Sequence, residues 1–143
     1  MEAAIVTMVA MDYLELARAL EREDAGGAVA REAAERLAVY GSLAPGEVNH
    51  WVLAGLEGTW TEGTVRGVRK PAGWGKALGF PGLIWNPEAD PVAVKLFESK
   101  DLPRNWERID AFEGDDYLRR LIPVERDGAL LVANIYALRT TAA

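Results

Sequence analysis

The stretch YLRRLIPVERDGALLVANIYAL, residues 117–138, decides the fold class of this chain. Two runs that look like strands, 117–125 and 129–138, lie on either side of the dipeptide Asp127-Gly128. Aspartate followed by glycine is a strong signal for the two-residue turn of a β-hairpin. The sequence therefore predicts two antiparallel strands joined by a tight turn.

Further short strands precede this hairpin. They are expected at residues 37–40, 59–69, 83–85 and 92–97, separated by turn signals such as Asn86-Pro87 and by a loop over 70–82 that is rich in glycine and proline. Two glycines on one side of the 59–69 strand, Gly63 and Gly67, indicate close approach of another chain segment or bending of the strand. Short strands around few helices predict an α+β domain with a curled sheet or barrel.

The helices are expected mainly before residue 37. Residues 11–24 form an amphipathic pattern, and Asp12 followed by Glu15 has the spacing of a capping box. A Gly26-Gly27 break separates this helix from a second short one over 29–36. The simplest interpretation of the second helix is an amphipathic cover for the sheet. Residues 51–56 are compatible with one helical turn.

Composition restricts the possible functions. The 143 residues include no cysteine and one histidine, His50, which excludes disulfides, thiolate metal sites and multi-histidine metal sites. A net charge of −6 argues against a nucleic-acid partner, which requires clustered lysine and arginine. No stretch approaches the roughly 20 apolar residues of a membrane helix. We expect a cytoplasmic protein with no signal peptide, no metal and no cofactor.

One glutamate occupies an unexpected position. Leu102, Trp106, Ile109 and Glu113 follow the spacing that places residues on one face of a helix expected from about 102 to 112. The first three are apolar, so this face is expected to be buried. Burial and the negative end of the helix dipole would both raise the pKa of Glu113, as suits a general acid/base.

Alternatives to this interpretation remain open. Glu113 could turn out to water or pair with Arg119 or Arg120. Asp110, Asp115 and Asp116 are expected to be solvated turn residues, and their spacing matches no metal-binding loop.

The segment Tyr40-Gly41-Ser42-Leu43 follows the first short strand. Successive backbone amides at such a turn can form a nest that binds a carboxylate or an oxyanion, and Ser42 adds a hydroxyl donor. The alternative is a plain turn at the end of a strand. A serine–histidine hydrolase with His50 is disfavoured, because the Gly-x-Ser-x-Gly elbow is absent.

These two segments, in this order, resemble the γ-glutamylcyclotransferase-like family, which includes the plant avirulence-induced proteins. The family has a Tyr-Gly-Ser/Thr-Leu/Asn loop and later a segment close to Leu-Asp-x-x-Glu-Gly, followed by a tyrosine and often Tyr-x-Arg. This chain has Tyr40 to Leu43, then 109–114 (IDAFEG), then 117–119 (YLR). The similarity covers about residues 37–138. Ile109 replaces the more common leucine, and the helical stretch before residue 37 is additional.

The resemblance implies a small mixed β-barrel of five to seven strands with flanking helices, over 37–143, with 1–36 as an N-terminal helical extension packed on it. It implies a cyclotransferase that converts a γ-glutamyl amine to 5-oxoproline. Glu113 would be the general acid/base, and the substrate-binding residues would be Tyr40, Gly41, Ser42, Leu43 and Tyr117.

Two other classes of function stay open. The same pocket could belong to a non-catalytic module that binds a small carboxylated metabolite, since a fold does not determine an activity. The N-terminal helices could instead bind a protein partner. The sequence identifies neither the amine released nor the oligomeric state.

Overall fold

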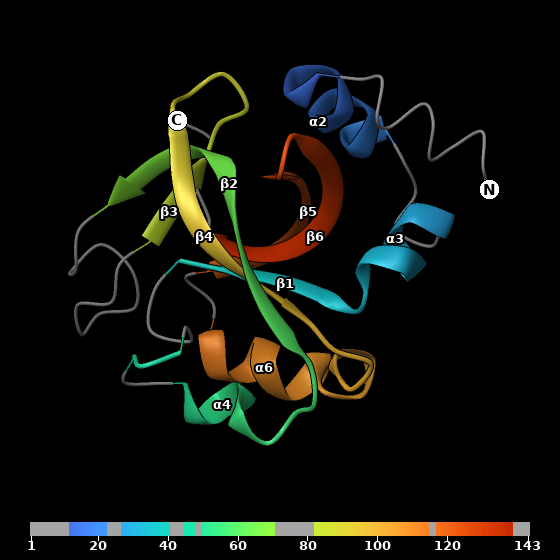
Figure 1. Ribbon diagram of the computed structural model, residues 1–143, viewed down its shortest axis with the longest axis vertical. Helices are drawn as coiled ribbons and strands as arrows, with labels where there is room; N and C mark the ends of the chain where they lie inside the picture. The colour runs from blue at the N-terminus through green and yellow to red at the C-terminus, as the bar shows by residue number, and fades with distance from the viewer. Residues whose placement is uncertain are drawn as a thin grey trace.

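The computed structural model describes residues 12–22, 27–40, 45–47, 50–70, 82–114 and 117–138. Within these ranges the chain forms six strands, which curl into a barrel with helices packed on its outside (Figure 1). Outside the described residues lie 41–44, which follow Tyr40, residues 71–81 of the loop expected over 70–82, and Asp115 and Asp116. Of the helices that are described, none is both long enough and apolar enough to cross a membrane.

Five strands close the barrel. They are hydrogen-bonded in the order β2 (Thr59–Lys70), β4 (Pro91–Glu98), β1 (Arg36–Val39), β6 (Ala129–Leu138) and β5 (Tyr117–Arg126). A pairing of Thr64 with Glu125 joins β2 back to β5. The barrel is mixed because β1 and β6 run parallel whereas the other neighbours are antiparallel. The sixth strand, β3 (Gly82–Trp85), pairs with the C-terminal end of β2. The predicted fold class is confirmed.

The hairpin at the C-terminal end has the predicted turn. Asp127 and Gly128 have φ values of 53° and 80°, and Arg126 pairs with Ala129 across the turn. Two successive residues with positive φ match the twist of the strands that they join. This turn sets the register of the longest antiparallel pair in the barrel, including the pairing of Arg119 with Tyr136.

Gly63 is needed where the barrel closes. A Cβ atom at this position would lie 2.8 Å from the backbone oxygen of Glu125 and 2.9 Å from a methyl group of Val124. Real Cβ atoms do not approach so closely, so β5 could not lie against β2 with a larger residue at this position. The close approach expected from the sequence is confirmed.

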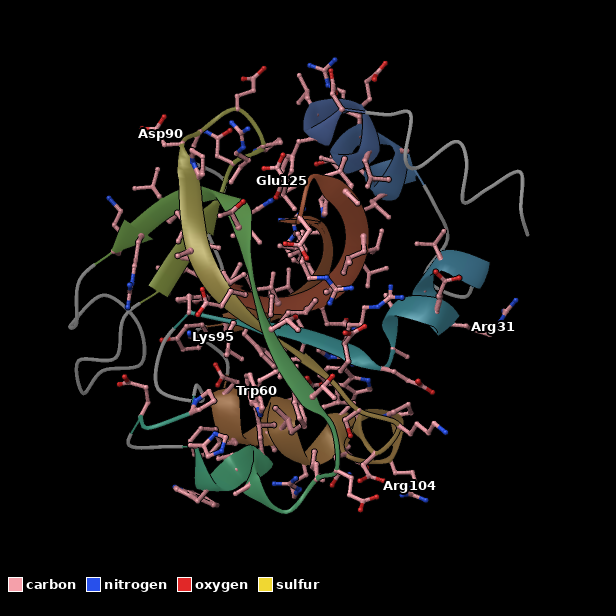
Figure 2. The ribbon with its side chains drawn as sticks, in the orientation of Figure 1. Arg31, Trp60, Asp90, Lys95, Arg104 and Glu125 are labelled. Atoms are coloured by element: carbon pink, nitrogen blue, oxygen red, sulfur yellow. The ribbon has the colours of Figure 1, made fainter. Side chains whose placement is uncertain are left out.

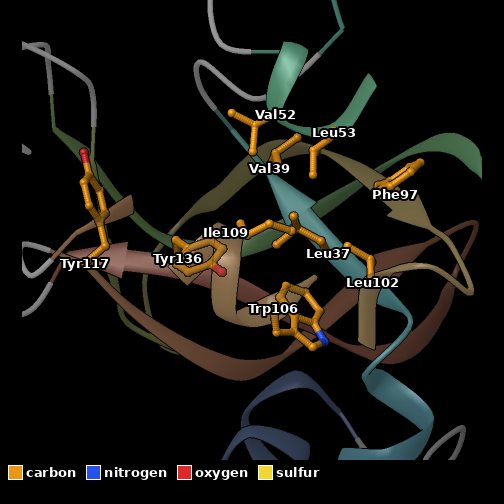
Figure 3. Packing of buried hydrophobic residues seen from close by; sticks show 10 residues of the cluster. All are labelled: Leu37, Val39, Val52, Leu53, Phe97, Leu102, Trp106, Ile109, Tyr117 and Tyr136. Atoms are coloured by element: carbon orange, nitrogen blue, oxygen red, sulfur yellow. The ribbon is translucent and has the colours of Figure 1, made fainter. Parts of the chain in front are cut away.

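Three apolar clusters stabilise the molecule. One fills the barrel, with Val65, Leu96 and Ile135 among its fully buried members. A second, whose ten residues are drawn in Figure 3, lies between the sheet and two helices, α4 (Trp51–Ala54) and α6 (Trp106–Glu113). The third packs α2 (Tyr13–Arg22) and α3 (Ala28–Ala33) against β5 and β6. The helices therefore cover two separate regions of the barrel's outer surface.

Helix α2 begins with the predicted capping box. The backbone N–H of Asp12 donates to Glu15 Oε1 at 3.1 Å, and the N–H of Glu15 donates to Asp12 Oδ1 at 2.8 Å. These reciprocal bonds satisfy two N–H groups that a helix start otherwise leaves without partners.

Tyr13 fixes α2 to the barrel. Its side-chain oxygen accepts the backbone N–H of Arg66 on β2 at 3.0 Å and the indole N–H of Trp85 on β3 at 3.3 Å. Arg66 lies just beyond the Thr64–Glu125 pairing, and Pro123 on β5 has no N–H to donate. Tyr13 thus bonds to β2 at the point where its pairing with β5 ends.

Two predicted helix boundaries were wrong. The helix expected over 29–36 ends at Ala33, because Arg36 already belongs to β1. The helix expected from about 102 begins instead at Trp106, after a separate 3₁₀ turn η1 over Leu102–Arg104. Asn105 separates the two with a φ of −118°, and its side-chain amide donates to the carbonyl of Asp101 at 2.7 Å. Local bonding of this kind competes with a continuous helix.

Candidate functional site

The site is built on the C-terminal end of α6. Leu102, Trp106 and Ile109 are 0%, 8% and 0% exposed, so the buried stripe predicted from the sequence is confirmed across the break at Asn105. Glu113 is the last helical residue and is partly buried. Gly114 ends the helix with a φ of 84°, a conformation that glycine adopts readily. The carboxylate of Glu113 is therefore placed where a buried face meets the surface.

Tyr40 follows strand β1 and lies close to this end of α6. Its hydroxyl donates to the carbonyl of Tyr136 at 2.6 Å and accepts the backbone N–H of Leu83 at 3.0 Å. Burial raises the pKa of Tyr40, and electrostatic interactions with Tyr117 and Glu113 raise it further. The hydroxyl therefore stays protonated at neutral pH, and Tyr117 and Glu113 lie within electrostatic reach of it.

Tyr136 lies on β6. Burial raises its pKa, and the hydrogen bond to Asp110 and the charges of Asp110 and Glu113 act in the same direction. The Tyr136 hydroxyl donates to Asp110 Oδ1 at 2.5 Å. Two carboxylates of α6, one helical turn apart, thus act on a single buried phenol.

Asp110 corrects an expectation from the sequence. It was expected to be a solvated turn residue, but it lies within α6 and accepts two hydrogen bonds from Arg119, at 2.8 Å from Nε and 3.3 Å from Nη2. Arg119 also donates to Asn134 Oδ1 at 3.1 Å and stacks on Trp106 at 4.3 Å from its ring centroid. The cause is the helix register: Asp110 is one turn before Glu113 and faces β5 and β6, where these partners lie.

The predicted site residues are brought together in part. Tyr40, Glu113 and Tyr117 lie near one another at the ends of β1, α6 and β5, and Tyr117 is 7% exposed. Gly41, Ser42 and Leu43 lie outside the described residues. Tyr136 and Asn134 were missed. The signal that could have found Tyr136 is the register of the predicted hairpin, which places it opposite Arg119.

Aromatic residues surround α4 beside this region. His50 directly precedes the first turn of α4, and its ring lies 5.6 Å from that of Trp60. Trp60 is labelled in Figure 2. Trp60 in turn stacks on Phe97 at 4.6 Å. Trp51 is 65% exposed, and its ring lies edge-on to that of Phe112 at 5.6 Å.

The chemistry available is proton transfer and hydrogen bonding. The site offers a carboxylate, Glu113, and the neutral phenols of Tyr40 and Tyr136. Among the residues that the structure describes, no group of three or more histidine, cysteine, aspartate or glutamate side chains could bind a metal ion. A partly buried carboxylate beside neutral phenols is suited to accept a proton from a bound substrate and to return it.

Comparison with known proteins identifies the family. A family model described as gamma-glutamyl cyclotransferase, AIG2-like, matches residues 37–143. A search of curated proteins finds no match.

Solved structures share the fold. The chain is similar to YkqA from Bacillus subtilis with 26% identity and a TM-score of 0.58, over 75% of this chain but only 36% of YkqA. An uncharacterized protein from Pyrococcus horikoshii matches with 24% identity and a TM-score of 0.53, over 74% of this chain and 79% of that one. An AIG2-like protein from Mus musculus matches with 21% identity and a TM-score of 0.55, over 76% of this chain and 79% of that one. Together with the family match over residues 37–143, this shared fold shows that the chain belongs to the gamma-glutamyl cyclotransferase, AIG2-like family.

Proposed function

We propose that this protein is a γ-glutamyl cyclotransferase, which converts a small γ-glutamyl amine or peptide to 5-oxoproline and a free amine. The observation that carries the proposal is the position of Glu113. It ends the buried stripe of α6, and its charge acts on the buried hydroxyls of both Tyr40 and Tyr136. The family match supports a cyclotransferase-like chemistry for residues 37–143.

The proposed reaction is an intramolecular acyl transfer. The α-amine nitrogen of the glutamyl group attacks its own γ-carbonyl carbon, a new C–N bond closes the five-membered lactam, and the bond to the leaving amine breaks. Glu113 accepts the proton that the attacking nitrogen loses and passes it to the leaving nitrogen. No atom is added or removed overall, so the reaction needs neither water nor an oxidant. Holding the flexible glutamyl chain in a bent conformation would contribute much of the rate.

The substrate-binding residues remain proposals. We assign the glutamyl end to the segment Tyr40–Leu43, whose backbone amides would neutralise the α-carboxylate or the developing oxyanion. Tyr117, buried beside Tyr40, would form a wall of the same pocket. In this proposal residues 37–143 form the catalytic domain and residues 1–36 pack on it. A cytoplasmic location remains a prediction from the sequence.

Product analysis tests the proposal. The full-length protein is incubated with γ-glutamyl dipeptides and with γ-glutamyl-ε-lysine, and 5-oxoproline and free amine are quantified together. The proposal predicts equal amounts of both products from at least one substrate. Glutamate in place of 5-oxoproline would indicate hydrolysis and contradict the mechanism. Saturable binding of a substrate without any product over hours would favour the binding module.

A further inference from the structure

A cavity of about 600 Å³ lies between the N-terminal helices and the barrel. Its walls come from α2 and α3 on one side and from α6, β5 and β6 on the other. None of Tyr40, Glu113 and Tyr117 is among the described residues that line it. Figure 1 shows α2 and α3 on a different part of the barrel surface from α4. The cavity is therefore distinct from the pocket proposed for the glutamyl substrate, although Arg119 and Asn134 of the network around Asp110 line part of it.

The cavity has an apolar part and a cationic part. Leu20, Val29 and Leu121 line it, and all three are partly buried members of the apolar cluster beneath α2 and α3. Arg119 and Arg120 line it as well. A cavity with this division suits a ligand that has an apolar portion and a negative charge.

Arg120 lacks the acceptors that a half-buried guanidinium requires. Its buried Nε has no hydrogen-bond partner among the described residues. The nearest carboxylate oxygen, Glu21 Oε2, is 4.0 Å from Nη2, beyond hydrogen-bond distance. The guanidinium of Arg120 stacks on the ring of Trp85 at 4.2 Å from the ring centroid. This stacking orients the guanidinium but provides no acceptor for the N–H groups that lie in its plane. Burial also lowers the pKa of Arg120, consistent with incomplete neutralisation.

Arg119 provides the contrast within the same cavity. It donates to both carboxylate oxygens of Asp110 and to Asn134, so its charge is already paired. Of the two arginines that line the cavity, Arg120 is therefore the one that has an N–H group without an acceptor among the described residues. One arginine, with Glu21 nearby, favours a singly charged ligand over a phosphate dianion.

We propose that this cavity binds a small organic acid, whose carboxylate pairs with Arg120 and whose alkyl part lies along Leu20, Val29 and Leu121. A planar carboxylate can accept two parallel N–H groups from one guanidinium. The ligand would bridge α2, α3 and β5. Leu20 and Val29 precede residue 37, where the family match begins, so the N-terminal extension provides one wall of the site. The proposal does not depend on the cyclotransferase activity.

Calorimetric titration of the full-length protein with sodium octanoate tests the site. Arg120→Gln removes the charge. Arg104→Gln is the matched control, because Arg104 is 78% exposed, bonds Asp101, and lies at the opposite end of the view from α2 in Figure 2. We expect saturable octanoate binding that weakens at least about tenfold in Arg120→Gln and is unchanged in Arg104→Gln.

Three further probes define the ligand class. Acetate has the charge without the alkyl part, 1-octanol has the alkyl part without the charge, and inorganic phosphate has charge alone. Each is expected to bind at least about tenfold more weakly than octanoate. Equal binding of octanol would mean that Arg120 is not used, and equal binding of phosphate would overturn the assignment to an organic acid.

A second variant keeps the test decisive if Arg120→Gln does not fold. Leu118 lines the same cavity and is 43% exposed, so Leu118→Asp is expected to fold and to repel a carboxylate. Octanoate should bind this variant at least about tenfold more weakly. Absence of saturable octanoate binding to the unaltered protein, or unchanged affinity in the variants, would overturn the proposal.

Discussion

Asp110 organises the interactions between α6 and the barrel. It accepts hydrogen bonds from both Arg119 and Tyr136, and Asn134 extends the network by donating to the carbonyl of Ala33 at 2.9 Å. Asn134 is itself only 4% exposed. The network therefore connects α6 with β5, β6 and the end of α3, and it fixes the helix that ends in Glu113.

Asp110→Asn is expected to destabilise the protein by about 1–2 kcal/mol, because Arg119 and Tyr136 both lose a charged acceptor. This expected loss of stability is smaller than that for a fully buried ion pair, because the Asp110 side chain is 43% exposed. Urea denaturation measures the change. Asp90→Asn, at an exposed aspartate before β4 (Figure 2), is the control and should change stability by less than about 0.5 kcal/mol. Equal effects of the two substitutions would contradict a structural role for the network.

Residue-scale prediction from the sequence succeeded for the buried stripe that leads to Glu113 and failed for Asp110. The burial of Leu102, Trp106 and Ile109 follows from helical spacing alone, so the unusual position of Glu113 on that stripe was visible in the sequence. The partners of Asp110 lie on strands 9 and 26 residues away, and no local pattern encodes such contacts. They follow only once the hairpin register is known.

Helix α2 is joined to the barrel through Tyr13. Tyr13→Phe removes the oxygen that accepts the N–H groups of Arg66 and Trp85. We expect a loss of about 1–3 kcal/mol in the free energy of unfolding, because both donors are left without that acceptor. Hydrogen exchange of the Arg66 amide should accelerate. The exposed Arg18 on the same helix supplies the control, Arg18→Gln. Unchanged exchange at Arg66 in Tyr13→Phe would show that α2 is not needed at this strand end.

The closure of the barrel depends on Gly63. Gly63→Ala would place a methyl group 2.8 Å from the Glu125 carbonyl oxygen, and we expect a cost of about 1–3 kcal/mol as β2 and β5 move apart. Gly55→Ala is the matched control, because no atom lies within 4 Å of its added Cβ and its φ is −84°. Thermal unfolding compares the two. A larger destabilisation from Gly55→Ala would contradict this account of closure.

The elements were largely predictable because each has a local signal. The Asp127-Gly128 turn and the Asp12/Glu15 capping box both appear in the structure as expected. The break at Asn105 was not predicted. The helical spacing of apolar residues continues across the break, so it gives no sign of it. The hydrogen bond from the Asn105 side chain to the Asp101 carbonyl accompanies the break and competes with the hydrogen bonds of a continuous helix.

At the scale of the whole molecule, buried tyrosines make the free energy of unfolding fall at high pH. The native pKa values of Tyr13, Tyr40 and Tyr136 are all raised above 10.0, with burial as the largest cause. Their contribution is fully present below pH 10.0, and it is lost as the pH rises towards the native values because the unfolded chain releases these protons first.

The expected result is a fall in the free energy of unfolding above about pH 10, by up to about 1.4 kcal/mol per pH unit for each tyrosine that stays protonated only when folded. Urea denaturation from about pH 8 to about pH 11 measures it. In Tyr136→Phe the free energy of unfolding should fall less steeply with pH, by up to the slope assigned to one tyrosine. This holds whatever the stability of the variant is at neutral pH. An identical slope in that variant would contradict the burial assigned to Tyr136.

The barrel and its family could be recognised from the sequence, whereas the roles of α2 and α3 could not. The second helix of the extension reads locally as an amphipathic cover for the sheet, and its residues Val29 and Ala33 belong to an apolar cluster with residues of β5 and β6. The contacts of the extension with Arg66 and Trp85, and the cavity beside Arg120, depend on how three separate segments pack. The spacing of apolar residues within one segment does not determine how that segment packs against a distant one.

The proposed activity depends most on the carboxylate of Glu113. The most direct measurement compares 5-oxoproline release by the unaltered protein, by Glu113→Gln and by Glu107→Gln, an exposed glutamate in the first turn of the same helix. Removing the general acid/base should lower kcat by about 10²–10⁴-fold in Glu113→Gln, while Glu107→Gln keeps full turnover. Turnover in Glu113→Gln within a few-fold of the unaltered protein would contradict the central claim.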